Sequence, residues 1–242
     1  LHPERIGGLL PVSTFSELDA QLECHAMNLY NGLVGIGFEF YLDLLMPLNF
    51  SNAYISANRE LMQVIKRVGA STNELYGIQN LMESLRNFQS ITPELERIQC
   101  PTMILNAEYD YLTPRHWHDT MRRGITGSRL VLVPHVCHAF TLEVPELTSR
   151  LVAHFVEQTE SEAWQGDQSV WIAAAHAEAR TLLTRCDKDH LRAIPLRAAT
   201  GSRSGSGSGR GQAGKTKPAA RAKSGETNQG RERPGRKTPA KG

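Results

Sequence analysis

Two short, continuous apolar runs separated by a helical segment constrain the fold of this chain more than any other feature. They are "MIL" at residues 103–105 and "LVLV" at residues 130–133. Unbroken runs of this length are typical of strands buried on both faces of a parallel sheet. Between them, Thr113 and Pro114 predict the cap and first residue of a helix that ends at Gly124, and Pro145 opens another helix. The order strand, helix, strand, helix predicts α/β architecture.

An acidic residue and a histidine follow these two runs. Asp110 lies after the first run, and His138 lies 28 positions later, after the second. In a parallel sheet, catalytic and ligand-binding side chains usually lie at the carboxyl ends of the strands. Either residue alone is more often a cap or a satisfied polar group. Their joint placement favours the acid and base of a catalytic triad, in which the carboxylate orients the imidazole.

The other histidines and the cysteines give weaker signals. His135 and His138 are three positions apart, as in some metal pairs, but no third ligand accompanies them, and we expect no metal. The "HWH" at 116–118 points its two histidines to different sides of a helix, and we expect both at the surface. The cysteines form no C-x-x-C pair, which favours free thiols over zinc sites or disulfides. We expect these thiols to be buried, except that Cys137, next to His138, is left open. We expect no cofactor.

The pattern is helical from residue 15 to residue 90. Apolar residues from Leu61 to Val68 recur at helical spacing, and Gly69 is expected to end that helix. Ser71 and Glu74 have the spacing of a capping box for a second helix, and "FEFYLDLLM" predicts another. We therefore expect an all-helical insertion between a short strand in residues 1–14 and the α/β segment of residues 99–158.

Several segments together resemble one enzyme superfamily. "IQCPTMILNAEYDYLTP" and "SRLVLVPHVCHAFTLEVPE" are similar to the last two sheet strands of the α/β hydrolases, with their acid and histidine loops. "LHPERIGGLLPVS" resembles the segment that enters the preceding strand, and residues 15–98 take the position of the helical cap. The resemblance covers about residues 1–158 and implies that Asp110 and His138 belong to a Ser-His-Asp triad. "LNAEYDYLTP" with "HAFTLE" also resembles the hydroxyacyl transferase branch.

The nucleophile that this resemblance implies is not in the sequence. The α/β hydrolases carry it in a G-x-S-x-G elbow that precedes the acid and the histidine in chain order. The chain has no such elbow, and its Gly/Ser tract at 201–209 comes after His138. We therefore expect the elbow and the oxyanion-hole donors to lie upstream of Leu1, and this chain to be the carboxyl-terminal part of an enzyme that is inactive alone.

The charges divide the chain into an acidic body and a basic tail. Residues 201–242 contain eleven Lys or Arg against two Glu, although the whole chain has a net charge of only +2. The tail has no aromatic residue and only alanine on the apolar side, so we expect it to be disordered. A basic tail can contact nucleic acid, but without aromatic side chains for base stacking we consider that partner unfavoured.

Two further expectations come from the remaining sequence. Residues 159–200 follow the last expected sheet helix, and we expect Trp164 and Trp171 to pack on the body as part of an appendage. No apolar run is long enough for a membrane span, and the first residues lack the pattern of a signal peptide, so we expect a cytoplasmic protein. The oligomeric state is left open.

The leading hypothesis is an α/β-fold hydrolase or acyltransferase that acts on a small-molecule ester or thioester. His138 would be the general base and then acid, and Asp110 would orient it. The alternative is a non-catalytic binding protein derived from this fold, in which the helical region holds an acyl chain or a protein partner. The sequence does not choose between water and another acyl acceptor.

Overall fold

The computed structural model describes residues 2–72 and 74–186. The chain divides into two units, Leu1–Leu196 and Arg197–Gly242, and the second lies wholly outside the described residues. The predicted disordered tail at 201–242 and the last part of the predicted 159–200 appendage therefore also lie outside them. All the helices and strands described below belong to the first unit.

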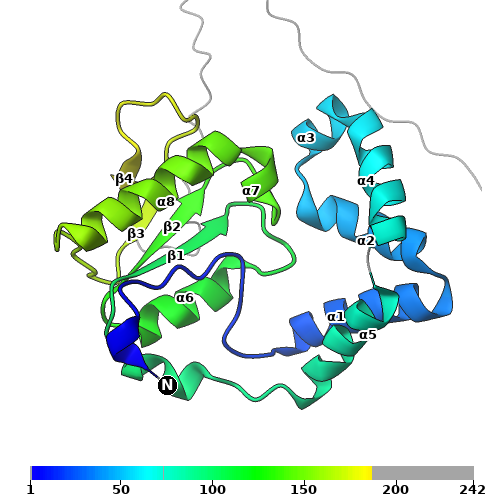
Figure 1. Cartoon of the computed structure of the whole chain (residues 1–242), viewed down its shortest axis with the longest axis horizontal. Helices are drawn as coiled ribbons and strands as arrows, with labels where there is room; N and C mark the ends of the chain where they lie inside the picture. The colour runs from blue at the N-terminus through cyan, green and yellow to red at the C-terminus, as the bar shows by residue number, and fades with distance from the viewer. Residues whose placement is uncertain (1, 73, 187–242) are drawn as a thin grey trace, which may run out of the picture. The chain divides into compact units, whose positions relative to one another are not determined.

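A four-stranded sheet in the order β1-β2-β3-β4 forms the centre of the α/β part (Figure 1). The strands are β1 (Thr102–Ala107), β2 (Ser128–Val133), β3 (Val170–Ala173) and β4 (Leu183–Arg185). The first three are parallel, and β4 pairs with β3 in the antiparallel sense. Register pairs Thr102 with Ser128 and Ala107 with Val133, so β1 and β2 end at the same edge of the sheet.

Helices cover both faces of this sheet, as the continuous apolar runs predicted. One face packs against α8 (Pro145–Glu160) through Leu147, Leu151 and Phe155. The other packs against α6 (Arg115–Gly124) and the short helix η3 (Thr92–Arg97). Consecutive residues of β1 alternate between the two clusters, since Met103 and Leu105 belong to the α8 side and Ile104 to the α6 side. Figure 1 shows α8 and α6 on opposite sides of the strands. The α/β prediction is confirmed.

The strand expected near the amino end forms only as isolated bridges. Leu9 and Val12 bridge in parallel to Thr102 and Leu105 of β1. The backbone of residue 11 accepts from the Leu105 N–H, but Pro11 has no N–H to donate in return. This missing donor interrupts the ladder, because proline cannot complete the hydrogen bonds of a regular strand.

Between residues 20 and 84, the described part of the chain contains five α-helices. They are α1 (Ala20–Gly35), α2 (Phe38–Asn49), α3 (Asn52–Ala57), α4 (Arg59–Thr72) and α5 (Leu75–Ser84). The expected end of α4 at Gly69 was wrong, because the helix continues to Thr72. Ser71 does not cap the next helix: its hydroxyl, like that of Thr72, donates back to the Val68 carbonyl oxygen of α4.

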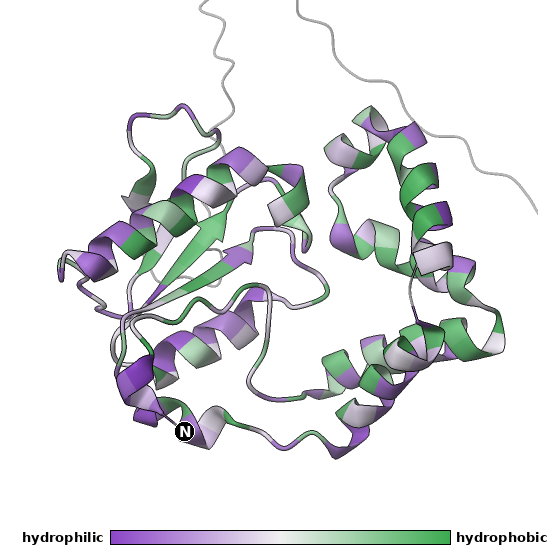
Figure 2. Ribbon diagram, in the orientation of Figure 1, coloured by the Kyte–Doolittle hydropathy of each residue, from purple (hydrophilic) through white to green (hydrophobic). Residues whose placement is uncertain are grey.

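Three short helices complete the described secondary structure, namely η1 (Pro3–Arg5), η2 (Leu85–Asn87) and α7 (Phe140–Glu143). Figure 2 shows apolar strands in the sheet and mixed apolar and polar surfaces along the helices. Of the helices in the described residues, none combines the length and the hydropathy that crossing a bilayer requires.

The segment after α8 extends the sheet, which the sequence did not predict. The indole of Trp164 donates to the Gly127 carbonyl oxygen at 2.9 Å and stacks edge-on against Phe155 of α8. The Arg129 guanidinium lies over both Trp164 and Trp171, 4.8 and 5.1 Å from their ring centroids. The expected packing of the two tryptophans on the body is confirmed, but they pack as part of the route into β3.

Candidate active site

The structure brings Asp110 and His138 together at the carboxyl edge of β1 and β2. Nδ1 of His138 lies 3.1 Å from Oδ1 and 3.0 Å from Oδ2 of Asp110. The Asp110 side chain is fully buried, whereas 24% of the His138 side chain is exposed. A buried acid thus holds the inner nitrogen of a ring that reaches solvent.

Asp110 is fixed by its own loop. Oδ1 accepts the backbone N–H groups of Leu112 and Thr113 at 3.1 and 2.7 Å, and Oδ2 accepts the Thr113 hydroxyl at 2.7 Å. The expectation that Thr113 caps α6 was wrong: Pro114 occupies the cap position and Thr113 binds the acid instead. An Asp side chain that binds backbone two and three residues ahead is a local turn preference, so this loop can form without distant contacts.

These contacts set the charge of Asp110 and the tautomer of His138. Burial alone would raise the pKa of Asp110, but the hydrogen bond and charge of His138, with the Thr113 donors, hold that pKa below its ordinary value. The carboxylate is ionised at neutral pH, so Nδ1 of His138 carries the proton that it donates. Among the described residues no hydrogen bond reaches Nε2. That nitrogen is therefore the available proton acceptor.

Backbone hydrogen bonds join the acid loop to the histidine loop. Glu108 donates its N–H to the Val133 carbonyl oxygen at 2.8 Å, and Tyr109 donates to the Val136 carbonyl oxygen at 3.0 Å. His135 turns the loop with a φ of 66°, and its N–H donates to the Glu108 carboxylate at 2.7 Å. A positive φ is uncommon outside glycine and is held here by these contacts.

His118 lies behind this site and corrects the expectation that both histidines of "HWH" are surface residues. His116 is exposed, but His118 is fully buried. Its Nε2 accepts the Thr14 backbone N–H at 3.1 Å, and its Nδ1 lies 3.3 Å from the Pro114 carbonyl oxygen. Burial lowers the pKa of His118 to about 4. His118 is therefore neutral at physiological pH and holds the start of α6 against residue 14.

The expectation of a buried thiol was wrong for Cys24, which is exposed. Cys137 and His135 lie close to His138 in the sequence. The Cys137 thiol is buried, and burial, followed by the nearby carboxylates of Glu143 and Asp110, raises its pKa to about 11. A thiol with that pKa is a poor nucleophile at neutral pH. His135 pairs with Glu108, 3.3 Å from Nδ1 to the carboxylate. In the described ranges no three residues of metal-ligating type group together.

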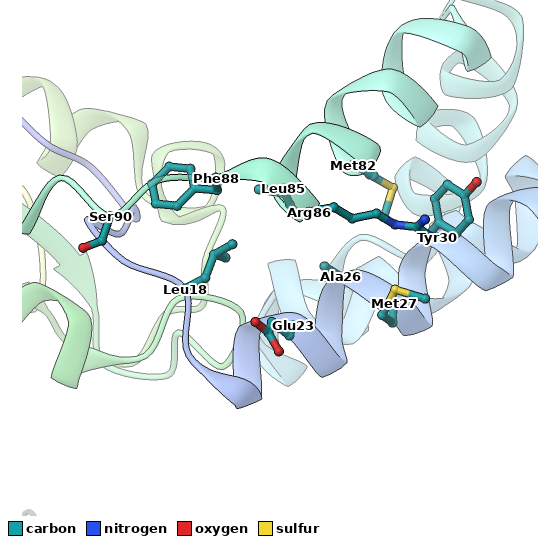
Figure 3. Close-up of a pocket in the computed structure, with 10 residues that line it drawn as sticks. All are labelled: Leu18, Glu23, Ala26, Met27, Tyr30, Met82, Leu85, Arg86, Phe88 and Ser90. Carbon is teal, nitrogen blue, oxygen red and sulfur yellow. The ribbon is translucent and has the colours of Figure 1, made fainter.

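A separate cavity of about 450 Å³ lies within the helical region (Figure 3). Its walls come from α1, from α5 with η2, and from the segments that flank them. Apolar side chains include Leu18, Met27 and Met82, while Tyr30 and Arg86 supply polar atoms. None of its lining residues belongs to the loops that hold Asp110 and His138. The Arg86 guanidinium lies over the Tyr30 ring, 5.6 Å from its centroid.

Sequence reasoning missed one residue of the histidine loop, Glu143. Its carboxylate accepts the Cys137 N–H at 2.9 Å and the Ser51 N–H at 3.1 Å, and it also accepts the Ser51 hydroxyl. The available signal was the single acidic residue of the stretch "HAFTLEV". That pattern indicates a carboxylate near the loop but does not give its partner 92 positions earlier.

Comparison with known proteins gives partial matches in sequence and longer matches in structure. No family model matches the chain. The serine hydrolase BPHL of Mus musculus is 38% identical over 63 residues, and that of Homo sapiens is 35% identical over 63 residues. Each match covers 26% of this chain and 22% of the relative, so the chain matches under a quarter of the curated relatives' length.

Three solved structures align over most of the described residues. MGS-M2, an α/β hydrolase enzyme from a Medee basin deep-sea metagenome library, has a TM-score of 0.55 at 22% identity, covering 62% of this chain and 55% of its own. A thermophilic esterase from Thermogutta terrifontis has a TM-score of 0.57 at 18% identity, and the match covers 65% of this chain and 58% of the esterase. The enol-lactonase from Burkholderia xenovorans has a TM-score of 0.53 at 17% identity, and the match covers 64% of this chain and 58% of the lactonase.

These alignments decide the fold. The matched region has the α/β-hydrolase fold. The chain spans between half and two thirds of the length of each of these structures. The predicted fold class is confirmed, whereas the catalytic roles of Asp110 and His138 and the cytoplasmic location stay predictions.

Proposed function

We propose that this chain supplies the acid and base of a Ser-His-Asp centre that cleaves a carboxylic ester or thioester. The observation that carries the proposal is the buried Asp110 carboxylate bonded to Nδ1 of His138, while no described residue forms a hydrogen bond with Nε2. Nε2 takes the proton of the attacking serine hydroxyl and then gives it to the leaving group. Asp110 holds Nδ1–H throughout and stabilises the imidazolium that forms.

We further propose that the attacking serine is not a residue of this 242-residue chain. The chain has no G-x-S-x-G elbow. Ser13, which has a φ of 42°, directs its hydroxyl to the carbonyl oxygen of His138 at 3.3 Å and to Oδ1 of Asn106 at 3.4 Å. Ser51 directs its hydroxyl to Glu143. Neither serine is paired with the base.

The chemistry of the similar proteins supports an ester or lactone carbonyl as the group attacked. Those proteins include an esterase and an enol-lactonase, both of which open a carbon–oxygen bond at an acyl carbon. The same acyl-enzyme step serves hydrolysis when water is the acceptor and acyl transfer when another nucleophile is. Exclusion of water by the helical region would decide between them.

The test uses a fluorophosphonate probe, which labels activated serines, and an activated ester as substrate. For the 242-residue chain alone we expect no stoichiometric labelling and no hydrolysis that depends on His138. For the chain extended by its upstream coding sequence we expect an in-frame elbow, labelling at its serine, and a loss of about a thousandfold or more in kcat with His138→Ala. Stoichiometric labelling of Ser13 or Ser51 in the chain alone would overturn the proposed source of the nucleophile.

The cavity in the helical region favours the alternative, a binding protein. It offers apolar walls from Leu18, Met27 and Met82, with the Arg86 guanidinium at its edge, independently of Asp110 and His138. Such a hollow suits a small aliphatic carboxylate. Isothermal titration with octanoate distinguishes the two functions: binding that is lost in Arg86→Gln, together with an extended chain that has no turnover, would support the binding protein.

A further inference from the structure

The residues on both sides of His138 are hydrogen-bonded to the same short segment of the helical region. On one side, the Cys137 N–H donates to the Glu143 carboxylate at 2.9 Å, and that carboxylate also binds Ser51. On the other side, the Ala139 N–H donates to the Asn49 carbonyl oxygen at 2.8 Å. Asn49 is the last residue of α2, and Ser51 precedes α3. The base of the site therefore lies between two attachments to residues 49–51.

Glu143 connects these two parts through a single carboxylate. Oε1 accepts the N–H groups of both Cys137 and Ser51, at 2.9 and 3.1 Å, and Oε2 accepts the Ser51 hydroxyl. No ion pair joins Glu143 to a cation in the described part of the chain. Hydrogen bonds to a carboxylate are charge-assisted and stronger than those between neutral groups.

Residues 49–51 are themselves firmly held within the helical region. Phe50 is 5% exposed and stacks on Tyr54 of α3, with the ring centroids 5.2 Å apart. The Ser51 hydroxyl accepts the Tyr54 N–H at 3.2 Å as the cap of α3. A displacement of α3 therefore moves Ser51 with it, and Ser51 cannot move without breaking its bonds to Glu143.

We propose that Glu143 is a positioning residue that couples the place of the α2–α3 junction to the orientation of His138. When the junction is seated, Glu143 and Asn49 hold residues 137 and 139, and the imidazole between them keeps Nδ1 on Asp110. When the junction lifts, the loop loses the Ala139 bond and both Ser51 bonds, and the imidazole loses its fixed orientation. The catalytic meaning of this coupling rests on the proposed function, but the coupling itself does not.

The test measures the coupling directly by NMR on the 242-residue chain. One readout is the hydrogen-exchange rate of the amides of Cys137, Ala139 and Tyr54. The other is the exchange rate of the His138 Nδ1 proton, which its bond to Asp110 protects. We expect Glu143→Ala to accelerate exchange at all four protons by about tenfold or more, because each depends on the same carboxylate or on the segment that it holds.

Three further variants keep the outcome interpretable. Glu143→Gln retains one acceptor oxygen and should restore much of the protection. Ser51→Ala removes only the hydroxyl bonds and should give an intermediate effect, about threefold, at Ala139 and His138. Glu146→Gln is the matched control, since Glu146 is an exposed glutamate in the first turn of α8 and should leave every rate unchanged.

Unchanged exchange at Ala139 and at the His138 Nδ1 proton in a folded Glu143→Ala variant would overturn the coupling. If Glu143→Ala fails to fold, Ser51→Ala becomes the deciding variant. Faster exchange at the Tyr54 amide alone, with unchanged exchange at Ala139 and at the His138 Nδ1 proton, would then overturn the coupling. Neither readout requires turnover. An absence of esterase activity in the extended chain would therefore count against the proposed function and leave this result intact.

Discussion

At the scale of single residues, His118 and His138 differ in burial: His118 is fully buried, whereas 24% of the His138 side chain is exposed. Asp110 and His138 could be predicted as site residues because each follows an apolar run, at the carboxyl end of a strand, where functional side chains of α/β sheets usually lie. His118 could not be assigned correctly, because burial of a helical histidine depends on what packs over it. Here that is residue 14, which lies 104 positions away and supplies the N–H that satisfies Nε2.

The burial of His118 predicts an acid-sensitive stability. Its pKa is about 4 in the folded chain, against about 6.5 when unfolded. Between these values the unfolded state binds more protons, so the free energy of unfolding falls as the pH falls from about 6.5 to 4, by up to about 1.4 kcal/mol per pH unit. The Asp110 contribution has the same sign but is lost only at lower pH, as that carboxylate becomes protonated.

Urea titrations at a series of pH values measure this slope. We expect His118→Gln to remove most of the dependence between about pH 6.5 and 4, since glutamine does not titrate there. His154→Gln on α8 is the control, because it leaves His118 and its contacts intact. An unchanged slope in His118→Gln would show that other groups account for the acid sensitivity.

At the scale of elements, apolar runs with clear boundaries predicted β1 and β2, whereas the sequence did not predict β3. β3 has only four residues, and its sequence runs into "IAAAHAEA", whose alanines favour a helix. The strand forms because β2 offers it a parallel edge and because α8 provides the crossover between them. Such pairing depends on partners distant in sequence, which local propensity does not record.

The path of the chain from α8 into β3 requires a residue without a side chain at position 166, where the sequence has glycine. A Cβ at this position would lie 2.0 Å from the Gly127 carbonyl oxygen, which already accepts the Trp164 indole and the Thr102 N–H. The Gly127 backbone cannot move aside as a flexible side chain can. We therefore expect Gly166→Ala to lower the free energy of unfolding by about 1–3 kcal/mol. Urea unfolding measures the change. Gly7→Ala, whose Cβ would meet nothing within 4 Å, should leave stability within about 0.5 kcal/mol.

At the scale of the whole molecule, the structure leaves apolar side chains of the helical region in solvent. Leu61, Val64 and Val68 share one face of α4 and are 42%, 42% and 50% exposed. The helical spacing of these residues was visible in the sequence. Their exposure was not, because a helical pattern identifies an apolar face without identifying what covers it. Isolated exposed apolar residues are common, but a stripe along one helix favours association.

We therefore expect the 242-residue chain to self-associate as its concentration rises. Sedimentation velocity over a concentration range of about a hundredfold should show an increasing weight-average sedimentation coefficient. Val68→Lys should reduce the increase by placing a charge within the stripe. Gln63→Lys adds the same charge to α4 outside the stripe and should not. A sedimentation coefficient independent of concentration in the unmodified chain would contradict the expectation.

The alignment of β1 with β2 has a consequence for how a complete centre could be assembled. Because Asp110 sits in a local turn and His138 follows the adjacent strand, the imidazole loses its rotational freedom as this region folds, and not when a reacting hydroxyl arrives. In a split-enzyme experiment, a second polypeptide carrying the elbow would meet a proton acceptor that is already oriented. Reconstitution would then be limited by docking of the two polypeptides, and its rate should rise in proportion to the concentration of the added piece.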